Sequence, residues 1–160
     1  MTFKTADLCD DHEGKISVVE PLFGDFGGNI SFSGKIFTIK CFEDNSLVGE
    51  ALKTPGEGRV LVVDGGGSIR KALVGDLLAQ AGADNNWSGI VVNGCIRDSR
   101  IISKISIGCK ALATFPMKTG KKGVGEQNLI VHFADVDFIP DHYLYADEDG
   151  IIVSANNLLS

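Results

Sequence analysis

The sequence contains no apolar run approaching the roughly 18 residues that span a membrane, and its polar beginning does not resemble a signal peptide. Its four cysteines form no C-x-x-C pair and no zinc-finger spacing with histidine, so we expect reduced thiols instead of disulfides or a structural zinc. The formal charge of −6 argues against the basic face that nucleic-acid-binding proteins usually show. These absences predict a cytoplasmic protein that binds neither membranes nor nucleic acid directly.

Hydrophobic residues make up 44% of the 160 residues, enough for a single domain over residues 1–160 that buries about two-thirds of its unfolded surface. Glycine is abundant, with 20 residues, which indicates many tight turns. We find no internal repeat and no linker, and strand-like segments outnumber helical ones. The predicted class is therefore α/β with a mixed sheet.

Residues 59–98 organise the rest of the chain. Apolar, β-branched runs at 59–64 and 87–93 are typical of buried parallel strands, and a helical pattern over about 69–83 supplies the crossover that such strands require. In units of this kind, ligands bind beyond the carboxyl ends of the strands. The polar residues at these ends are therefore the first candidates for a site.

Shorter elements flank this unit. Apolar and polar residues alternate before it, as in a half-exposed strand, and glycine-rich or acidic turns separate the segments after it. We expect helices over 1–14, 44–52 and 101–105, and strands over 31–41, 109–115, 129–133, 136–139 and 151–153.

The turn Gly65-Gly66-Gly67-Ser68 after the first central strand invites a dinucleotide-binding interpretation. The G-x-G-x-x-G pattern fails, however, because Arg70 stands at its last glycine position, and no G-K-[ST] follows. A structural turn is the favoured interpretation, although the amides of such a turn can also hold an anion.

Gly75-Asp76 interrupts the helical pattern, because glycine inside a helix costs about 1 kcal/mol relative to alanine. We expect a break there, with Asp76 near the start of a new helical turn. The amides of Asp76, Leu77 and Leu78 would then face a site that can hold a carboxylate. A plain N-terminal cap by Asp76 explains the same residues equally well.

Arg97-Asp98 follows the second central strand. As a surface ion pair it would contribute little. At the end of a strand, however, Arg97 can hold a carboxylate or an enolate with two hydrogen bonds. Asp98 offers oxygen to a hard cation such as Mg²⁺, which proteins usually bind through one or two carboxylates, waters and substrate oxygens.

The remaining basic and histidine residues give weaker signals. The basic segment over 117–123 is most simply a solvated loop, from which one lysine could reach an anionic substrate. The histidines have no visible Ser, Cys or Asp partner, so a hydrolytic triad has little support. These residues are Lys118, Lys121, Lys122, His12, His132 and His142.

Four segments together are highly specific: VVEPLF at 18–23, CFEDN at 41–45, RVLVVDGGGS at 59–68 and YAD at 145–147. Over almost the whole chain the sequence resembles the family of the regulator of ribonuclease activity A. That family includes the metal-dependent 4-hydroxy-4-methyl-2-oxoglutarate aldolases, also called HMG/CHA aldolases. In these aldolases a Gly-Asp (or Gly-Glu) with two following apolar residues precedes an Arg-Asp by about twenty residues, and this chain has both motifs.

The resemblance implies roles for these residues. Asp98 is expected to ligate Mg²⁺ or Mn²⁺, Arg97 to contact the keto-acid, and Asp76 to orient metal-bound water. The amides after Gly75 are expected to hold substrate oxygens. The catalytic residues would be Arg97 and Asp76, and the substrate-binding set would be Gly75, Asp76, Leu77, Leu78 and Arg97.

The resemblance further implies a swivelling β/β/α-type fold and a ring-shaped homotrimer with sites at subunit interfaces, and it leaves open whether trimers pair into hexamers. Ile101 departs from the family, which often has an acidic residue there that would tune the metal site. The presence of Asp98 favours the aldolase instead, because the members known for binding ribonuclease E typically lack this aspartate.

We expect retro-aldol cleavage of 4-hydroxy-4-methyl-2-oxoglutarate and related 4-hydroxy-2-oxo acids to pyruvate. Asp98 would hold the cation that chelates the small keto-acid, and Arg97 would stabilise the pyruvate enolate. Oxaloacetate decarboxylation should accompany cleavage, because it forms the same enolate. A Schiff-base mechanism needs a desolvated lysine, for which Lys40 is the weak strand-end candidate.

The alternative is a non-enzymatic protein inhibitor of ribonuclease E that modulates RNA degradation. An acidic rim could engage basic segments of such a partner. Its candidate residues are Asp135, Asp137, Asp141, Asp147, Glu148 and Asp149. Loss of the carboxylate at Asp98 distinguishes the two functions, because an aldolase needs it and a protein inhibitor does not.

Overall fold

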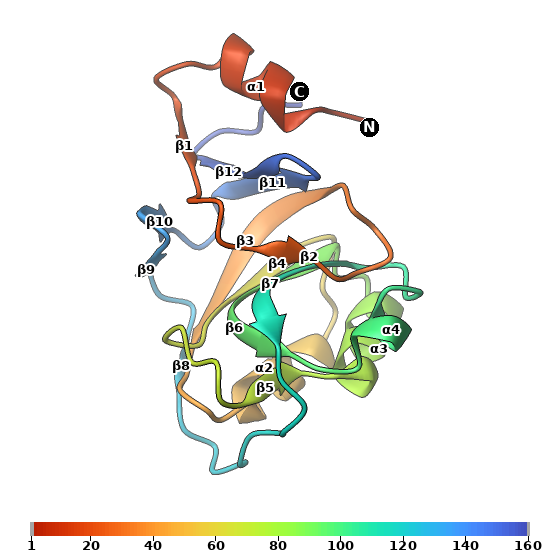
Figure 1. Cartoon of the computed structure of the whole chain (residues 1–160). Helices are drawn as coiled ribbons and strands as arrows, with labels where there is room; N and C mark the ends of the chain where they lie inside the picture. Colours follow the sequence, from red (N-terminus) through yellow and green to blue (C-terminus); the bar gives the residue numbers. More distant parts are fainter. Residues whose placement is uncertain (1, 160) are drawn as a thin grey trace.

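The computed structural model describes residues 2–159, and parallel strands form the central layer of the fold (Figure 1). Their order is β3 (Phe32–Lys40), β4 (Val60–Asp64), β6 (Gly89–Ile96) and β7 (Gly108–Thr114). The predicted pairing of the two central runs is confirmed, since Val60 lies opposite Gly89 and Asp64 lies opposite Asn93.

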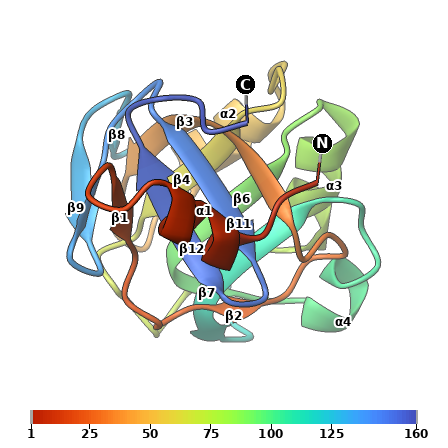
Figure 2. The same cartoon turned by 90° about the horizontal axis from the view of Figure 1, so that it is seen from above.

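A second β layer continues from β3 and lies over the central one. It consists of β11 (Tyr143–Asp147), β12 (Gly150–Ser154) and the edge strand β1 (Ile16–Val18), all paired antiparallel. Helix α1 (Thr5–Asp11) packs on the outside of this layer, as seen from above in Figure 2. Leu8 of this helix forms a buried cluster with Tyr145 and Ile152.

Three helices cover the other face of the central layer: α2 (Ser46–Leu52), α3 (Asp76–Asp84) and the single turn α4 (Ser99–Ile102). Residues of β4 alternate between the two faces, as successive side chains of a strand must. Leu61 and Val63 join the core beneath the helices, whereas Val60 and Val62 join the core between the β layers. Burial on both faces explains the uninterrupted apolar run in the sequence.

A buried lysine joins the layers. Lys110 in β7 is 2% exposed, and its Nζ lies 2.8 Å from Oδ1 of Asp25 in the short strand β2 (Gly24–Asp25). The same Nζ donates to the carbonyl of Asp147 at 2.7 Å. The Asp147 carboxylate in turn accepts hydrogen bonds from the amide and hydroxyl of Thr5, at 2.7 and 2.6 Å. This network ties α1 and the second β layer to the central sheet.

The helix expected over about 69–83 begins later than predicted. Its first part is strand β5 (Ala72–Val74), which is fully buried and pairs with Cys95 and Ile96 of β6, beyond the point where β4 ends. The helical pattern was misleading because these apolar residues fill a gap in the sheet. The predicted break is confirmed, since Gly75 is the N-cap of α3.

Most other elements agree with expectation within a few residues. The predicted hairpin is β9 (Val131–Phe133) and β10 (Val136–Phe138), joined by a two-residue turn in which Ala134 and Asp135 both have positive φ. Sequence reasoning missed β11, and also β8 (Glu126–Gln127), which pairs with β3. The helix expected over 1–14 is confined to α1, and residue 1 lies outside the described residues.

The predicted thiols are confirmed, because all four cysteines are unpaired. Burial raises the pKa of both Cys41 and Cys109 to about 12, so neither thiol ionises readily. Within residues 2–159 no helix is long and apolar enough to cross a membrane.

Candidate functional site

Two predicted motifs meet where β5 and β6 end. The amide of Arg97, directly after β6, donates to the carbonyl of Val74, the last residue of β5, at 2.9 Å. This hydrogen bond holds Arg97-Asp98 against the start of α3. Parallel strands that end side by side therefore bring residues 75–78 and 97–98 to the same edge of the sheet.

A cavity of about 300 Å³ lies at this edge, between α2, α3 and the segment after β7. Every residue predicted for the site lines it: Gly75, Asp76, Leu77, Leu78, Arg97 and Asp98. The size suits a small organic acid, at the lower end of ligand cavities, which are roughly 300–1,000 Å³.

The Asp98 carboxylate is held toward the cavity by its backbone and by one amide. Asp98 is the N-cap of α4 with φ of 59°, and it makes no side-chain hydrogen bond to that helix. Instead, Oδ2 accepts from the amide of Asp76 at 3.1 Å and lies 4.0 Å from Nε of Arg97. The side chain is 35% exposed, so the ion pair contributes little to stability and both groups can contact a ligand.

The amide contact refines the predicted role of the α3 N-terminus. The amide of Asp76 orients the Asp98 carboxylate, which leaves the amides of Leu77 and Leu78 for substrate oxygens. Amides of the first helical turn have no partner four residues earlier within the helix, and the helix dipole favours an anion beside them.

Gly75 lies against the Asp98 carboxylate. A Cβ atom added at this glycine would be 2.9 Å from Oδ2 of Asp98 and 3.5 Å from Nε of Arg97. We expect Gly75→Ala to displace the Asp98 carboxylate. For the expected aldol cleavage, kcat/KM should then fall on the order of 10²-fold, because small misplacements of reacting groups slow the reaction strongly. The melting temperature should change little, since the φ of −119° suits alanine. Steady-state kinetics and thermal melts test this, and an unchanged rate would contradict it.

The residues present fit a divalent cation that is held by few protein ligands. Among residues 2–159 no group of three histidine, cysteine or acidic side chains could hold a metal. Asp98 supplies one partly exposed carboxylate, and Asp76 is the second acid of the cavity. Mg²⁺ keeps several waters and commonly takes only one or two carboxylates, so this donor set suits Mg²⁺ or Mn²⁺ and not zinc.

Asn45 is a cavity residue that sequence reasoning missed, because it entered only as part of the CFEDN segment and of the helix expected over 44–52. Its Nδ2 donates to the carbonyl of Leu73 at 3.0 Å, and its amide donates to Oγ1 of Thr119 at 3.2 Å. Its Oδ1 is buried and has no hydrogen-bond partner among residues 2–159, although the residue as a whole is part of the cavity lining. A buried acceptor without a partner costs about 1–3 kcal/mol.

Basic residues also line the cavity. Lys118 and Lys121, from the predicted basic loop, both line it, and Lys53 joins them from the end of α2. Lys122 does not line it. With Arg97, these lysines outnumber the acids Asp76 and Asp98, so the cavity favours a ligand with more than one negative charge.

The glycine turn proves structural. The amides of Gly65 and Gly67 both donate to the carbonyl of Asn93 at 3.1 Å, and the amide of Gly66 donates to Oδ1 of Asp64 at 3.0 Å. Neither Asp64 nor the glycines line the cavity. These amides are used for packing β4 against β6, which agrees with the favoured interpretation.

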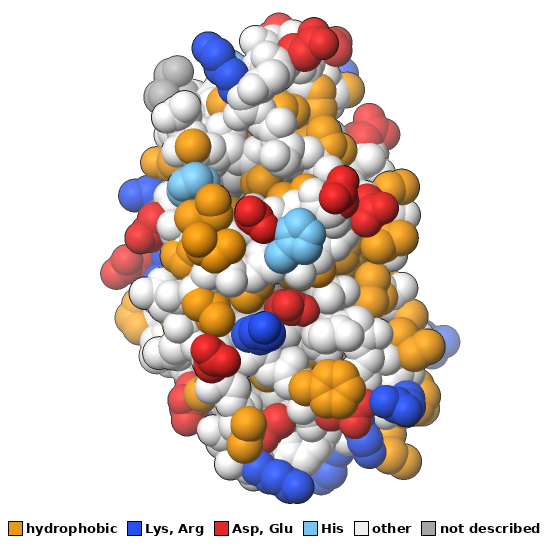
Figure 3. All heavy atoms as spheres, turned by 90° about the vertical axis from the view of Figure 1, so that its left-hand side faces the viewer, with side chains coloured by type: hydrophobic (Ala, Val, Ile, Leu, Met, Phe, Trp, Pro, Cys, Tyr) orange, Lys and Arg blue, Asp and Glu red, His pale blue; other side chains and the backbone are white. Residues whose placement is uncertain are grey.

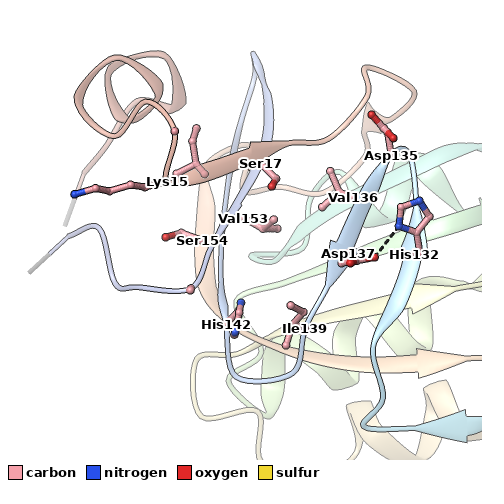
Figure 4. A pocket seen from close by; sticks show the side chains of 13 residues that line it. Lys15, Ser17, His132, Asp135, Val136, Asp137, Ile139, His142, Val153 and Ser154 are labelled. Atoms are coloured by element: carbon pink, nitrogen blue, oxygen red, sulfur yellow. Dashed lines mark hydrogen bonds and ion pairs between the residues drawn. The ribbon is translucent and has the colours of Figure 1, made fainter.

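A larger hollow of about 490 Å³ lies between β1 and β10 and shares no lining residue with the first cavity (Figure 4). Here the expectation that no histidine has an acidic partner is wrong, because His132 Nδ1 lies 2.7 Å from Oδ1 of Asp137. The hairpin places the two residues directly opposite each other. Both side chains are more than 60% exposed, and Figure 3 shows this side of the molecule, where histidine, acidic and hydrophobic side chains mix.

The predicted acidic rim does not form one surface on the chain. Asp135 and Asp137 lie near the end of β12, beside Ser154, whereas Asp147 and the turn after it lie at the start of β12. Asp147 is 3% exposed and is bound to Thr5, so it cannot meet a partner protein.

Comparison with known proteins shows the family of the chain. The model of the RraA-like family, described as Aldolase/RraA, matches residues 5–153. The chain belongs to the RraA-like family. The resemblance stated from four sequence segments is therefore confirmed.

Relatives of the RraA-like family are similar to the chain over nearly their whole length. A protein of Azotobacter vinelandii named "Putative 4-hydroxy-4-methyl-2-oxoglutarate aldolase" is 56% identical over 158 residues, or 99% of this chain and 98% of the relative. A protein of Aromatoleum aromaticum with the same name is 54% identical over 159 residues, or 99% of this chain and 100% of the relative.

Solved structures that are similar to this chain carry other names. The RNA-processing inhibitor RraA from Thermus thermophilis is 39% identical, with a TM-score of 0.94, over 98% of this chain and 94% of that chain. A Geobacillus kaustophilus protein named S-adenosylmethionine: 2-dimethylmenaquinone methyltransferase is 46% identical, with a TM-score of 0.94, over 98% of both chains. One fold thus carries three names, so function must be argued from the site.

Proposed function

We propose that the chain is a divalent-metal-dependent aldolase that cleaves 4-hydroxy-4-methyl-2-oxoglutarate and related 4-hydroxy-2-oxo acids to pyruvate. The observation that carries this proposal is the single small cavity lined by Arg97, Asp98 and the first turn of α3. The names of the 54–56% identical relatives support the same substrate class. The charged lining suits a small acid better than an adenosine ring.

The cavity residues divide the work of binding. Arg97 presents a planar guanidinium that can hold the C1 carboxylate with two hydrogen bonds, and the amides of Leu77 and Leu78 can hold further oxygens. Lys118 and Lys121 also line the cavity, and they would receive the second carboxylate of a dicarboxylic substrate. A cation held by Asp98 would supply Lewis-acid polarisation of the 2-oxo group.

Cleavage needs one proton removed and one negative charge stabilised. Asp76, through a water, would take the proton of the C4 hydroxyl. The C3–C4 bond then breaks, C4 becomes the carbonyl of one product, and the electron pair forms the enolate of pyruvate. Arg97 stabilises this charge until C3 is protonated. Oxaloacetate decarboxylation passes through the same enolate and is the expected side activity.

Metal removal tests the proposal. We expect EDTA to abolish pyruvate release from 4-hydroxy-4-methyl-2-oxoglutarate and from oxaloacetate, and Mg²⁺ or Mn²⁺ to restore it, in a coupled pyruvate assay. A Schiff-base enzyme would behave differently, because borohydride would trap a lysine adduct in the presence of EDTA. Pyruvate release that survives EDTA, together with a lysine adduct that borohydride traps, would contradict the metal-dependent mechanism.

We place the site at a contact between copies of the chain in a ring-shaped homotrimer. Leu77 and Ile101 flank the cavity region on α3 and α4 and are 80% and 51% exposed, so a neighbouring subunit would bury apolar surface there. A solution mass equal to one chain would contradict this assembly.

Inhibition of ribonuclease E is the second candidate, favoured by the 39% identity to the Thermus RNA-processing inhibitor. Of the acids named for such a contact, Asp147 is buried, and those that remain exposed are Asp135, Asp137, Asp141, Glu148 and Asp149. A salt-sensitive pull-down with the nuclease, repeated with Asp98→Ala, separates this function from the aldolase. Both could coexist, because the acids lie outside the cavity.

A further inference from the structure

The segment over residues 117–125, which we call the strap, crosses the start of α2 beside the cavity. Three consecutive amides in it are bound by two side chains from the start of that helix. Oδ2 of Asp44 accepts from the amides of Lys122 and Val124, at 2.8 and 3.2 Å. Oγ of Ser46 accepts from the amide of Gly123 at 3.1 Å.

Asp44 uses both of its oxygens. Its Oδ1 accepts from the amide and hydroxyl of Ser46, at 2.9 and 2.7 Å, while Oδ2 binds the strap. The residue is 5% exposed. The hydrogen bonds from Ser46, followed by those from the strap, lower the pKa of this carboxyl strongly, so it is ionised throughout the range in which enzymes work. A charged acceptor that binds several amides holds them more firmly than a neutral one.

Backbone bridges hold the first part of the strap, where Lys118 pairs with Ala72 and Gly120 pairs with Asp44. Thr119 is its one buried residue, and its hydroxyl accepts from the amide of Asn45. From residue 120 to residue 125 every side chain is exposed, so apolar packing cannot fix this part. Yet Lys118 and Lys121 of the strap line the cavity. The position of Lys121 therefore depends on the hydrogen bonds to its neighbours.

We propose that Asp44 is a positioning residue that fixes residues 121–125 of the strap, and with them Lys121, at the substrate cavity. It contacts no substrate itself. Through the strap it sets how strongly the cavity binds the second carboxylate of an acid, and it holds Asn45 at the same place by anchoring the start of α2. This inference rests on the proposed function.

Asp44→Asn is the sharpest test, because the amide cannot satisfy both sides. With Oδ1 toward Ser46, its NH₂ group faces the amides of Lys122 and Val124. All of these groups are donors, so the hydrogen bonds to the strap are lost. With the amide reversed, the NH₂ group faces the amide of Ser46. We expect KM for the keto-acid to rise on the order of tenfold while kcat changes by less than about threefold, the pattern of lost ground-state binding. Ser46→Ala should act in the same direction with a smaller effect.

Asp147→Asn is the matched control. Asp147 is also a buried carboxylate that binds a backbone amide and a hydroxyl, in this case those of Thr5 far from the cavity. It should lower thermal stability and leave KM unchanged. If both variants raise KM equally, the effect is general loosening of the fold and the inference is wrong.

Two measurements test the positioning role of Asp44 without requiring turnover. Hydrogen exchange of a peptide covering 117–125 should be slow in the wild type and fast in Asp44→Asn. Calorimetric titration with 2-oxoglutarate and Mg²⁺ should show weaker binding in the variant, because this uncleaved keto-acid has the second carboxylate. A strap that already exchanges fast in the wild type, or unchanged 2-oxoglutarate affinity in the variant, would overturn the inference. Binding of 2-oxoglutarate that follows the expected pattern without any pyruvate release would instead overturn the proposed function alone.

Discussion

Replacing Asp98 with asparagine should lower kcat/KM for pyruvate release about 10²- to 10³-fold, the cost of losing one preorganised charged group at a reacting centre. Asparagine has the same size, can accept the hydrogen bond from the amide of Asp76, and adopts the left-handed backbone found at this position. The free energy of unfolding should therefore change by less than about 0.5 kcal/mol, as for most substitutions of exposed groups. A coupled pyruvate assay and urea denaturation measure the two effects.

Asp84→Asn provides the control for this experiment. Asp84 ends the same helix, α3, and its carboxylate accepts a hydrogen bond from Gln80 at 2.8 Å on the exposed side. Its replacement removes one negative charge from the chain and should leave the rate unchanged. Full activity in Asp98→Asn, or an equal loss in Asp84→Asn, would remove Asp98 from the mechanism.

Replacing Lys110 with methionine should destabilise the fold by about 3–5 kcal/mol, because it leaves a partly buried carboxylate without its cation. The Nζ atom contacts both Asp25 and the carbonyl of Asp147, so the central sheet, β2 and the β11–β12 turn lose their common partner. Urea denaturation measures the change. The metal-dependent rate at low temperature should persist in the folded fraction, since Lys110 does not line the cavity.

Two further variants make this prediction specific. Lys110→Met combined with Asp25→Leu should recover part of the stability, because an apolar pair no longer buries an unpaired charge. Lys40→Met should change neither stability nor rate, since Lys40 is exposed at the end of β3 and does not line the cavity. Loss of activity in Lys40→Met would revive the Schiff-base mechanism, and full stability of Lys110→Met would contradict the role assigned to the buried pair.

The sequence was a good guide to features that depend on neighbouring residues. The apolar runs predict β4 and β6 because both faces of these strands are buried, and Gly75 marks the start of α3 because it interrupts a helical pattern. Placing Arg97 and Asp98 beside that helix needs only the rule that parallel strands end at one edge.

Features that depend on distant contacts could not be predicted in this way. Asn45 reaches Leu73 and Thr119, which are 28 and 74 positions away, and Asp44 reaches the strap over 78 to 80 positions. Lys110 gives no local sign of burial, because its partners lie in other strands. The apolar residues of β5 fit the pattern of a helix as well as that of a strand. They form a strand because they pair with the end of β6, which the local sequence does not show.

The backbone at Asp98 has one more consequence. A φ of 59° is open to glycine, asparagine and aspartate alike, so the architecture imposes no choice among them. Any requirement for the acid at this position therefore comes from the chemistry proposed for the site. A single codon change could replace this side chain without weakening the protein, and would leave the same scaffold without the proposed activity.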